Sequence, residues 1–121
     1  MEVKHLTEEG KLQKWQTEFK KGFSKPLILL TLAEEQSYPY RLTRKISEKT
    51  KGQIIIAGSN IYPILKNQED EGLIQGIKDE KTGRKLYHLT EEGQEFLKLL
   101  KSSMKEFCEN ILAVVDDQRR V

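Results

Sequence analysis

The order of apolar and polar positions predicts a mainly helical chain with one pair of short strands. The segment from Leu27 to Ala33 is apolar on nearly every face of a helix, so we expect it to be the buried central helix of the fold. A helix over residues 60–71 would bury Ile61, Ile64 and Leu65 and turn its polar residues outward.

Serine and proline residues mark where three of these helices are expected to begin. A serine before the first turn accepts a hydrogen bond from an unpaired N–H, and a proline in that turn sacrifices no hydrogen bond. The pattern predicts helix starts near residues 25, 38 and 60. The pairs are Ser24 with Pro26, Ser37 with Pro39, and Ser59 with Pro63. Gly52 and Gly72 are the expected ends of the second and third helices, with Leu73 after Gly72 completing a Schellman ending.

Two extended runs follow, over residues 73–78 and 85–89. The polar segment 79–84, which contains Gly83, separates them and is typical of a hairpin tip.

A long helix is expected on each side of this unit, and both begin with the same pentapeptide. Residues 6–10 and 89–93 both read Leu-Thr-Glu-Glu-Gly, with a threonine N-cap and two glutamates in the first turn. Apolar stripes follow each start. The first contains Leu12, Trp15, Phe19 and Phe23, and the second, with heptad spacing, contains Leu97, Leu100, Met104, Phe107, Ile111 and Val114.

Composition and charge exclude several classes of protein. The longest apolar run, Pro26–Leu30, is far shorter than the ~20 residues that a membrane helix needs, and residues 1–9 lack the apolar core of a signal peptide. The lone Cys108 favours a reducing, cytoplasmic setting, and His5 and His88 do not form a metal-binding pattern. We therefore predict no membrane association, no metal and no cofactor.

Positive charge is concentrated in the middle of the chain. The net charge of the whole chain is only +2, but residues 38–88 contain ten basic and six acidic residues. Such an excess of positive charge usually marks only a solvent-exposed face of the protein. Here it coincides with three helices followed by a hairpin, the order of a winged helix-turn-helix, in which the third helix enters the DNA major groove. The fold class expected is mainly α with a small β-hairpin (α+β).

Five motifs in this order resemble the PadR-like family of winged-helix transcriptional regulators. They are Gly22-Phe23-Ser24-Lys25-Pro26-Leu27-Ile28-Leu29, Ser37-Tyr38-Pro39-Tyr40-Arg41-Leu42, Gly58-Ser59-Asn60-Ile61-Tyr62-Pro63-Ile64-Leu65, Glu69-Asp70-Glu71-Gly72-Leu73-Ile74 and Gly83-Arg84-Lys85-Leu86-Tyr87-His88-Leu89-Thr90-Glu91-Glu92-Gly93. The resemblance covers about residues 22–115. Two departures are Pro39, where the family usually has glycine, and Asn60-Ile61, where it usually has Thr-Leu.

The resemblance implies a homodimeric, sequence-specific regulator of transcription, a repressor that binds a pseudo-palindromic double-stranded DNA site. The residues expected to contact or brace DNA are Tyr38, Tyr40, Arg41, Arg44, Lys45, Ser59, Asn60, Tyr62, Lys66, Asn67, Lys81 and Arg84. The expected dimer interface contains Leu12, Trp15, Phe19, Leu97, Leu100, Met104, Phe107, Ile111 and Val114. A small planar aromatic effector near Trp15 is a further expectation, although packing at an interface is the simpler interpretation of this tryptophan.

The expected organisation is one winged-helix domain over residues 1–121. It consists of an N-terminal helix within 1–22, a DNA-binding core over 23–89, and a C-terminal dimerisation helix and tail over 90–121. Cys108 is expected to be a small buried apolar residue, and His88 to be a surface or half-buried strand residue.

Three alternatives to a specific regulator belong to other functional classes. No catalytic grouping of residues is evident, so we do not expect an enzyme. A winged helix also serves as a protein-interaction module, which would bind duplex DNA negligibly. A chromatin-like protein that coats DNA without sequence preference is the other alternative, and competitor DNA would distinguish it from a specific regulator.

Overall fold

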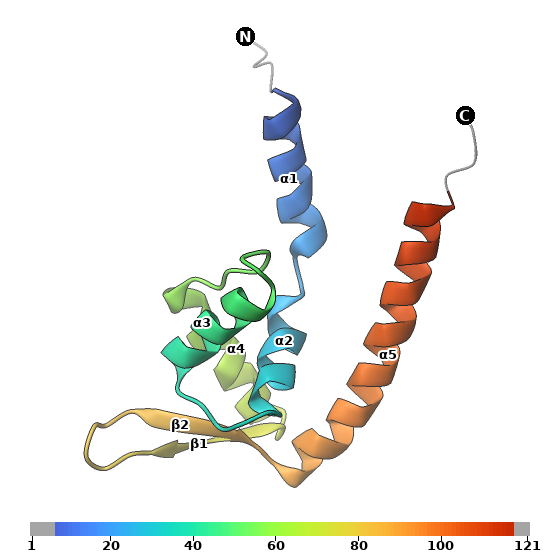
Figure 1. Cartoon of the computed structure of the whole chain (residues 1–121). Helices are drawn as coiled ribbons and strands as arrows, with labels where there is room; N and C mark the ends of the chain where they lie inside the picture. Colours follow the sequence, from blue (N-terminus) through green and yellow to red (C-terminus); the bar gives the residue numbers. More distant parts are fainter. Residues whose placement is uncertain (1–6, 118–121) are drawn as a thin grey trace.

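The computed structural model describes residues 7–117, which fold into five helices and one hairpin. In chain order the elements are α1 (Glu8–Lys20), α2 (Ser24–Leu32), α3 (Pro39–Lys49), α4 (Gly58–Asp70), β1 (Ile74–Lys78), β2 (Lys85–Leu89) and α5 (Glu91–Asp116). This is the predicted winged helix with an added helix at each end (Figure 1). His5 and Leu6 lie outside the described residues.

The core lies where α2, α3 and α4 meet the hairpin. Helix α2 is its central element, as the apolar run predicted, since Ile28, Leu29 and Leu32 are almost fully buried. The amphipathic faces of α3 and α4 complete it from either side. The remaining buried apolar residues are Leu42, Ile46, Ile56, Ile61, Leu65, Leu73, Ile74, Tyr87 and Leu97.

The threonine caps form as predicted, but the serine caps do not. Thr7 and Thr90 accept hydrogen bonds from the N–H groups of Gly10 and Gly93, both at 3.0 Å. The N-cap positions of α2, α3 and α4 are occupied by Phe23, Tyr38 and Ala57, and none of the three makes a side-chain cap bond.

The reason for the difference is visible at each serine. Ser37 is buried and pairs its backbone with Tyr87 in an isolated bridge, so it belongs to the sheet rather than to a helix start. Ser24 and Ser59 already lie within their helices. Pro39 opens α3 as expected, whereas Pro63 lies inside α4, so its expected place in the first turn is wrong.

Helices α3 and α4 both end in Schellman motifs. For α4 the motif is the predicted one, with the Gly72 N–H bonded to the Glu69 carbonyl and the Leu73 N–H bonded to the Gln68 carbonyl. For α3 the left-handed position directly after the cap is Lys51, with φ of 54°, and Gly52 follows it with φ of 77°. The left-handed position that follows the cap is therefore one residue before the predicted glycine.

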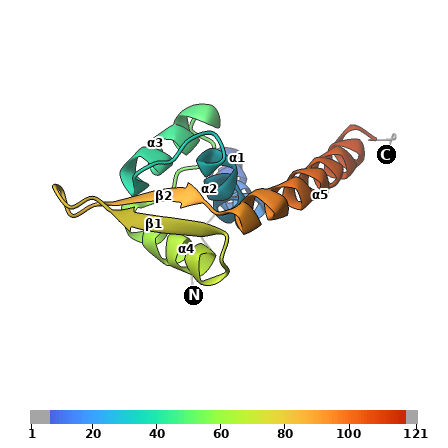
Figure 2. The ribbon, with the colours of Figure 1, turned by 90° about the horizontal axis from the view of Figure 1, so that it is seen from below.

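The strands pair antiparallel from Ile74 opposite Leu89 to Lys78 opposite Lys85. Seen from below, the hairpin lies between α3 and α4, and its tip projects away from α5 (Figure 2). His88 is half-buried on β2, as expected.

The two flanking helices extend from the body of the fold toward the same side (Figure 1). Helix α1 buries none of its residues, and α5 buries only Gly93 and Leu97. Cys108 is exposed on the outer part of α5, so its predicted burial is wrong for the single chain: this part of the helix extends beyond the core. Within residues 7–117 no helix has the length and apolar character needed to cross a membrane.

Candidate nucleic-acid interface

Helix α4 separates a buried face from a polar face. Ile61, Leu65 and Gln68 point into the core, and Ile64 is half-buried. The α4 residues predicted to contact or brace DNA are all exposed. They are Ser59, Asn60, Tyr62, Lys66 and Asn67. The outward face thus offers amide and hydroxyl groups, which suit hydrogen bonding to base edges.

An aromatic stack connects the start of α3 to the hairpin. The rings of Tyr38 and Tyr40 lie 6.2 Å apart between centroids, with an angle of 12° between their planes. The Arg84 guanidinium carbon lies 5.4 Å from the centroid of the Tyr40 ring, within the range of a cation–π contact. The structure therefore brings Arg84 of the hairpin tip to Tyr40, a predicted site residue that lies much earlier in the sequence.

Asp79 fixes the base of the hairpin tip. The Tyr38 hydroxyl donates to the Asp79 carboxylate at 3.5 Å, and the Asp79 N–H donates to the Arg84 carbonyl at 2.7 Å. The Lys81 N–H donates to the same carboxylate at 2.9 Å. Sequence reasoning missed Asp79, because its partner Tyr38, at the N-cap of α3, lies 41 residues earlier in the chain.

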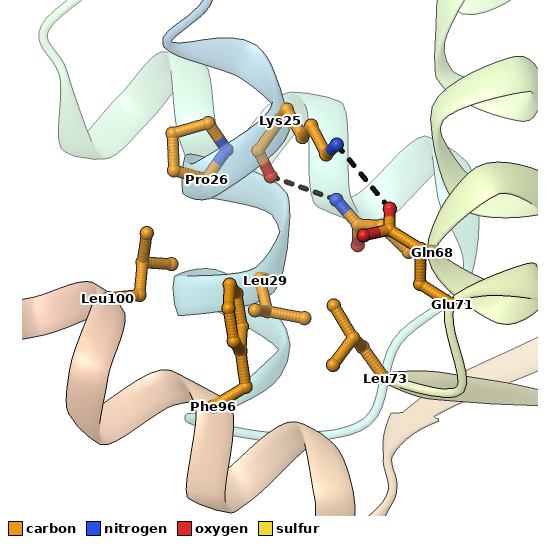
Figure 3. Close-up of a pocket in the computed structure, with 8 residues that line it drawn as sticks. All are labelled: Lys25, Pro26, Leu29, Gln68, Glu71, Leu73, Phe96 and Leu100. Atoms are coloured by element: carbon orange, nitrogen blue, oxygen red, sulfur yellow. Dashed lines mark hydrogen bonds and ion pairs between the residues drawn. The ribbon is translucent and has the colours of Figure 1, made fainter.

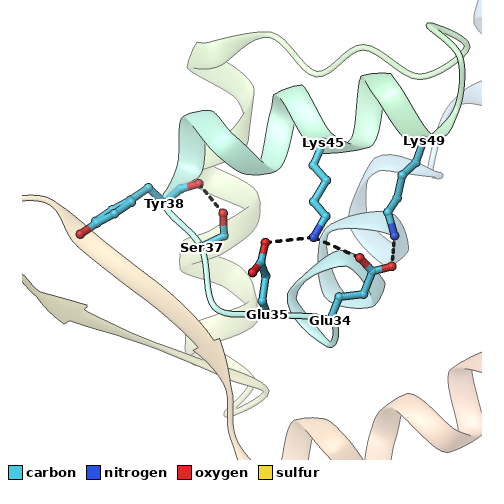
Figure 4. Close-up of polar contacts among 6 residues, drawn as sticks. All are labelled: Glu34, Glu35, Ser37, Tyr38, Lys45 and Lys49. Atoms are coloured by element: carbon cyan, nitrogen blue, oxygen red, sulfur yellow. Dashed lines mark hydrogen bonds and ion pairs between the residues drawn. The ribbon is translucent and has the colours of Figure 1, made fainter.

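The predicted cationic residues differ in how their charges are paired. Lys45 is the most strongly held, since its ammonium group lies 3.1 Å from a Glu34 carboxylate oxygen and 3.2 Å from one of Glu35 (Figure 4). Lys49 also pairs with Glu34. These pairs fasten the turn after α2 onto α3, a role that the sequence did not reveal.

The other cations predicted to contact DNA are more available for binding phosphate. Arg44 lies 3.8 Å from Glu48 and Lys66 lies 3.7 Å from Asp70, both in largely exposed pairs. Such exposed pairs contribute little energy, so the cations can exchange partners readily. Arg41, Lys81 and Arg84 make no ion pair with any residue from 7 to 117.

The side chain of Tyr87, on strand β2, packs into the hydrophobic core. Burial raises the pKa of its phenol, and the negative charge of Glu69 raises that pKa further. The side chain is only 5% exposed and belongs to the core rather than to the polar face.

A second surface, distant from the hairpin tip, is apolar. The predicted interface residues Leu12, Trp15 and Phe19 on α1 are 55%, 73% and 62% exposed. On α5 the apolar stripe has a buried part and an exposed part. Leu97 and Leu100 pack on the core of the same chain, Met104 is half-buried, and Phe107, Ile111 and Val114 are exposed. An open groove of about 350 Å³ joins the two helices, lined by Phe19, Met104 and Phe107 among others.

Comparisons with known proteins agree on one family. A model of the transcriptional regulator PadR-like family matches residues 28–99. The transcriptional regulator YqjI of Escherichia coli is 30% identical over 95 residues, which is 78% of this chain and 45% of that protein. The chain thus spans less than half the length of this relative.

Solved structures match over nearly their whole length. A transcriptional regulator from Clostridium thermocellum is 26% identical with a TM-score of 0.71, over 83% of this chain and 96% of that one. A PadR-like transcriptional regulator from Bacillus cereus is 27% identical with a TM-score of 0.71, over 84% of this chain and 99% of that one.

Proposed function

Because the chain belongs to the PadR-like family of transcriptional regulators, we propose that it represses transcription as a homodimer bound to a pseudo-palindromic duplex site. Two α4 helices would lie in successive major grooves, about 34 Å apart. The observation that carries the proposal is the outward face of α4. It presents exposed amides on a helix whose opposite face is buried, and that helix contacts both α3 and the hairpin.

The proposed contacts divide into two kinds. Asn60 and Asn67 read base edges, because an asparagine amide can bond to both the N6 and N7 positions of adenine. Tyr38, Tyr40 and Tyr62 lie near the phosphates or brace the helix, and Ser59 faces the groove. Arg41, Arg44, Lys66, Lys81 and Arg84 supply affinity through the phosphates, and Lys45 contributes less because Glu34 and Glu35 already pair with it.

The dimer is proposed to form through α5 and α1. The exposed parts of their apolar stripes are continuous with the groove near Phe19 and Phe107, and a second copy of the chain would cover them. Leu97 and Leu100 would support this interface from within the core. In this arrangement residues 23–89 bind DNA, residues 1–22 and 90–121 assemble the dimer, and the protein has no catalytic role.

The planar aromatic effector remains a separate expectation. Its test is the fluorescence of Trp15, the only tryptophan, which would change on titration with planar aromatic compounds.

The decisive experiment is selection from random duplexes by the purified protein at ~150 mM salt, where weak non-specific attraction is screened. We expect enrichment of a two-fold symmetric motif. Binding without enrichment would favour the DNA-coating alternative. Absence of binding would favour the protein-interaction alternative, and either result would overturn the proposal.

A further inference from the structure

The hairpin tip, residues 79–84, is closed by hydrogen bonds of its own. The Asp79 N–H donates to the Arg84 carbonyl, and the Gly83 N–H donates to the Asp79 carbonyl, both at 2.7 Å. The Asp79 carboxylate accepts from the Lys81 N–H at 2.9 Å, which is the bond of an Asx turn. Asp79 therefore contributes its N–H, its carbonyl and its side chain to the shape of the tip.

The base and the tip of the hairpin are attached to the rest of the protein in different ways. At the base, the backbones of Ser37 and Tyr87 exchange two hydrogen bonds of 3.0 and 2.9 Å. The tip projects beyond this bridge (Figure 2), and two strands alone give little stability in water. The direction of the tip therefore depends on side-chain contacts further out.

Two such contacts join the tip to the start of α3. The half-buried Tyr38 points toward the hairpin (Figure 4), and its hydroxyl donates to the Asp79 carboxylate at 3.5 Å. The Arg84 guanidinium lies over the ring of Tyr40, which stacks on Tyr38. Asp79 thus both shapes the tip and joins it to the aromatic stack.

The charge of Asp79 is unfavourable at a surface that meets phosphate. Lys81 and Arg84 lie on the same tip, and a carboxylate beside them repels the negative backbone of DNA. It does not neutralise them either, since Asp79 forms no ion pair with any cation from residue 7 to residue 117. The contribution of this side chain is therefore geometric.

We propose that Asp79 is a positioning residue for DNA binding, which holds Lys81 and Arg84 in place before DNA arrives. It acts through the Asx turn and the Tyr38 hydroxyl and needs no contact with DNA. A tip that is already ordered loses less conformational entropy on binding, so its order is worth affinity. This inference rests on the proposed DNA-binding function.

Asp79→Asn and Asp79→Ala are a matched pair, because they remove the same charge. Asparagine keeps both contacts, since its carbonyl accepts from the Lys81 N–H and its amide donates to the phenolic oxygen of Tyr38. Charge alone would make both variants bind duplex equally well. We expect Asp79→Asn to bind at least as tightly as the wild type, and Asp79→Ala to bind about 5-fold more weakly than Asp79→Asn. Titration of a labelled duplex from the selection experiment gives the affinities.

The salt dependence distinguishes positioning from a direct phosphate contact. Both variants keep Lys81 and Arg84, so their slopes of log K against log salt should agree although their affinities differ. Loss of a residue that itself binds phosphate would instead change the slope by about one unit.

The position of the tip can also be measured without DNA. The side-chain protons of Arg84 lie over the Tyr40 ring, so their NMR signals should be shifted upfield in the wild type and in Asp79→Asn. In Asp79→Ala they should move toward the values of a flexible arginine. If that variant does not fold, Tyr38→Phe removes the hydroxyl donor and should reduce the same shift.

The possible failures are distinguishable. Equal affinities of Asp79→Asn and Asp79→Ala for a duplex that the wild type binds would overturn this inference alone. An Arg84 signal that is unchanged in Asp79→Ala would do the same. Failure of the wild type to bind any duplex would overturn the proposed function, and this inference with it.

Discussion

Helices α1 and α5 start within the same pentapeptide, Leu-Thr-Glu-Glu-Gly, but their surroundings differ. Both threonines cap their helices in the same way, at 3.0 Å from the glycine N–H. Beyond that bond, α1 buries no residue, whereas α5 packs Gly93 and Leu97 into the core. The Thr90 hydroxyl also donates to the Gly72 carbonyl at 2.6 Å. The same pentapeptide therefore forms the same N-cap at both helices. The contribution of that cap to the stability of the fold depends on the residues that pack around it.

The largest expected difference between the two copies is at the glycines. A Cβ at position 93 would lie 2.0 Å from the Leu73 carbonyl oxygen, so Gly93→Ala must push α5 away from the hairpin. We expect about 3 kcal/mol of destabilisation, measured by urea unfolding at one protein concentration. Gly10→Ala, on a helix without buried residues, should stabilise by up to about 1 kcal/mol. Equal effects at both positions would contradict this interpretation.

The outer parts of the two helices should matter for assembly rather than for folding of the single chain. Phe107→Asp places a charge in the proposed interface, and we expect dimerisation to weaken by about 100-fold or more. The variant should keep the helical circular-dichroism spectrum, since Phe107 is 54% exposed. Sedimentation over a concentration series measures the effect. A matched control is Lys105→Asp, outside the apolar stripe of the same helix, which should leave the dimer intact.

Loss of the two caps provides a finer test. Thr90→Ala removes two hydrogen bonds, one of them to the loop after α4, and should cost about 2 kcal/mol. Thr7→Ala removes one exposed bond and should cost about 0.5–1 kcal/mol. Thr90→Ser keeps both bonds and should restore most of the stability. Urea unfolding compares all three variants, and equal costs at Thr7 and Thr90 would be inconsistent with the structure.

The same contrast applies to two cations predicted to contact phosphate. Arg84 has no ion-pair partner among the described residues, whereas Lys45 is held by Glu34 and Glu35. Arg84→Ala should flatten the slope of log K against log salt by about one unit for every duplex tested. Lys45→Ala should change that slope by less and mainly reduce stability. A larger slope change for Lys45 would show that its ion pairs open on binding DNA.

The smallest effect is expected at alkaline pH. The pKa of the buried Tyr87 is raised, so the folded state retains the phenolic proton at a pH where the unfolded chain releases it. The stability from this group is complete below the unfolded pKa of about 10 and declines as the pH rises above it. Tyr87→Phe should show a smaller decline in thermal stability over that range. An unchanged decline would assign the effect to other groups.

The sequence by itself determined the elements of this fold and its family. The apolar run of α2, the polar hairpin tip and the threonine caps each depend on residues a few positions apart, and such signals act before any tertiary contact forms. The exposed amides on α4 followed from helical periodicity alone.

Features that depend on contacts between distant segments of the chain were decided only by the tertiary structure. Ser37 joined the sheet because Tyr87 lies beside it, and Lys45 was paired because the turn after α2 brings two glutamates to α3. Leu97 and Leu100 belong to a regular heptad, but α5 lies against the core only over its first turns, so the same stripe is buried at one end and exposed at the other. In the sequence Gln68 is one more polar residue on a helix, and only the packing of α2 and α5 leaves its oxygen buried with no donor among residues 7–117 (Figure 3). Local patterns specify which backbone forms, whereas burial and pairing depend on contacts between segments that are far apart in the sequence.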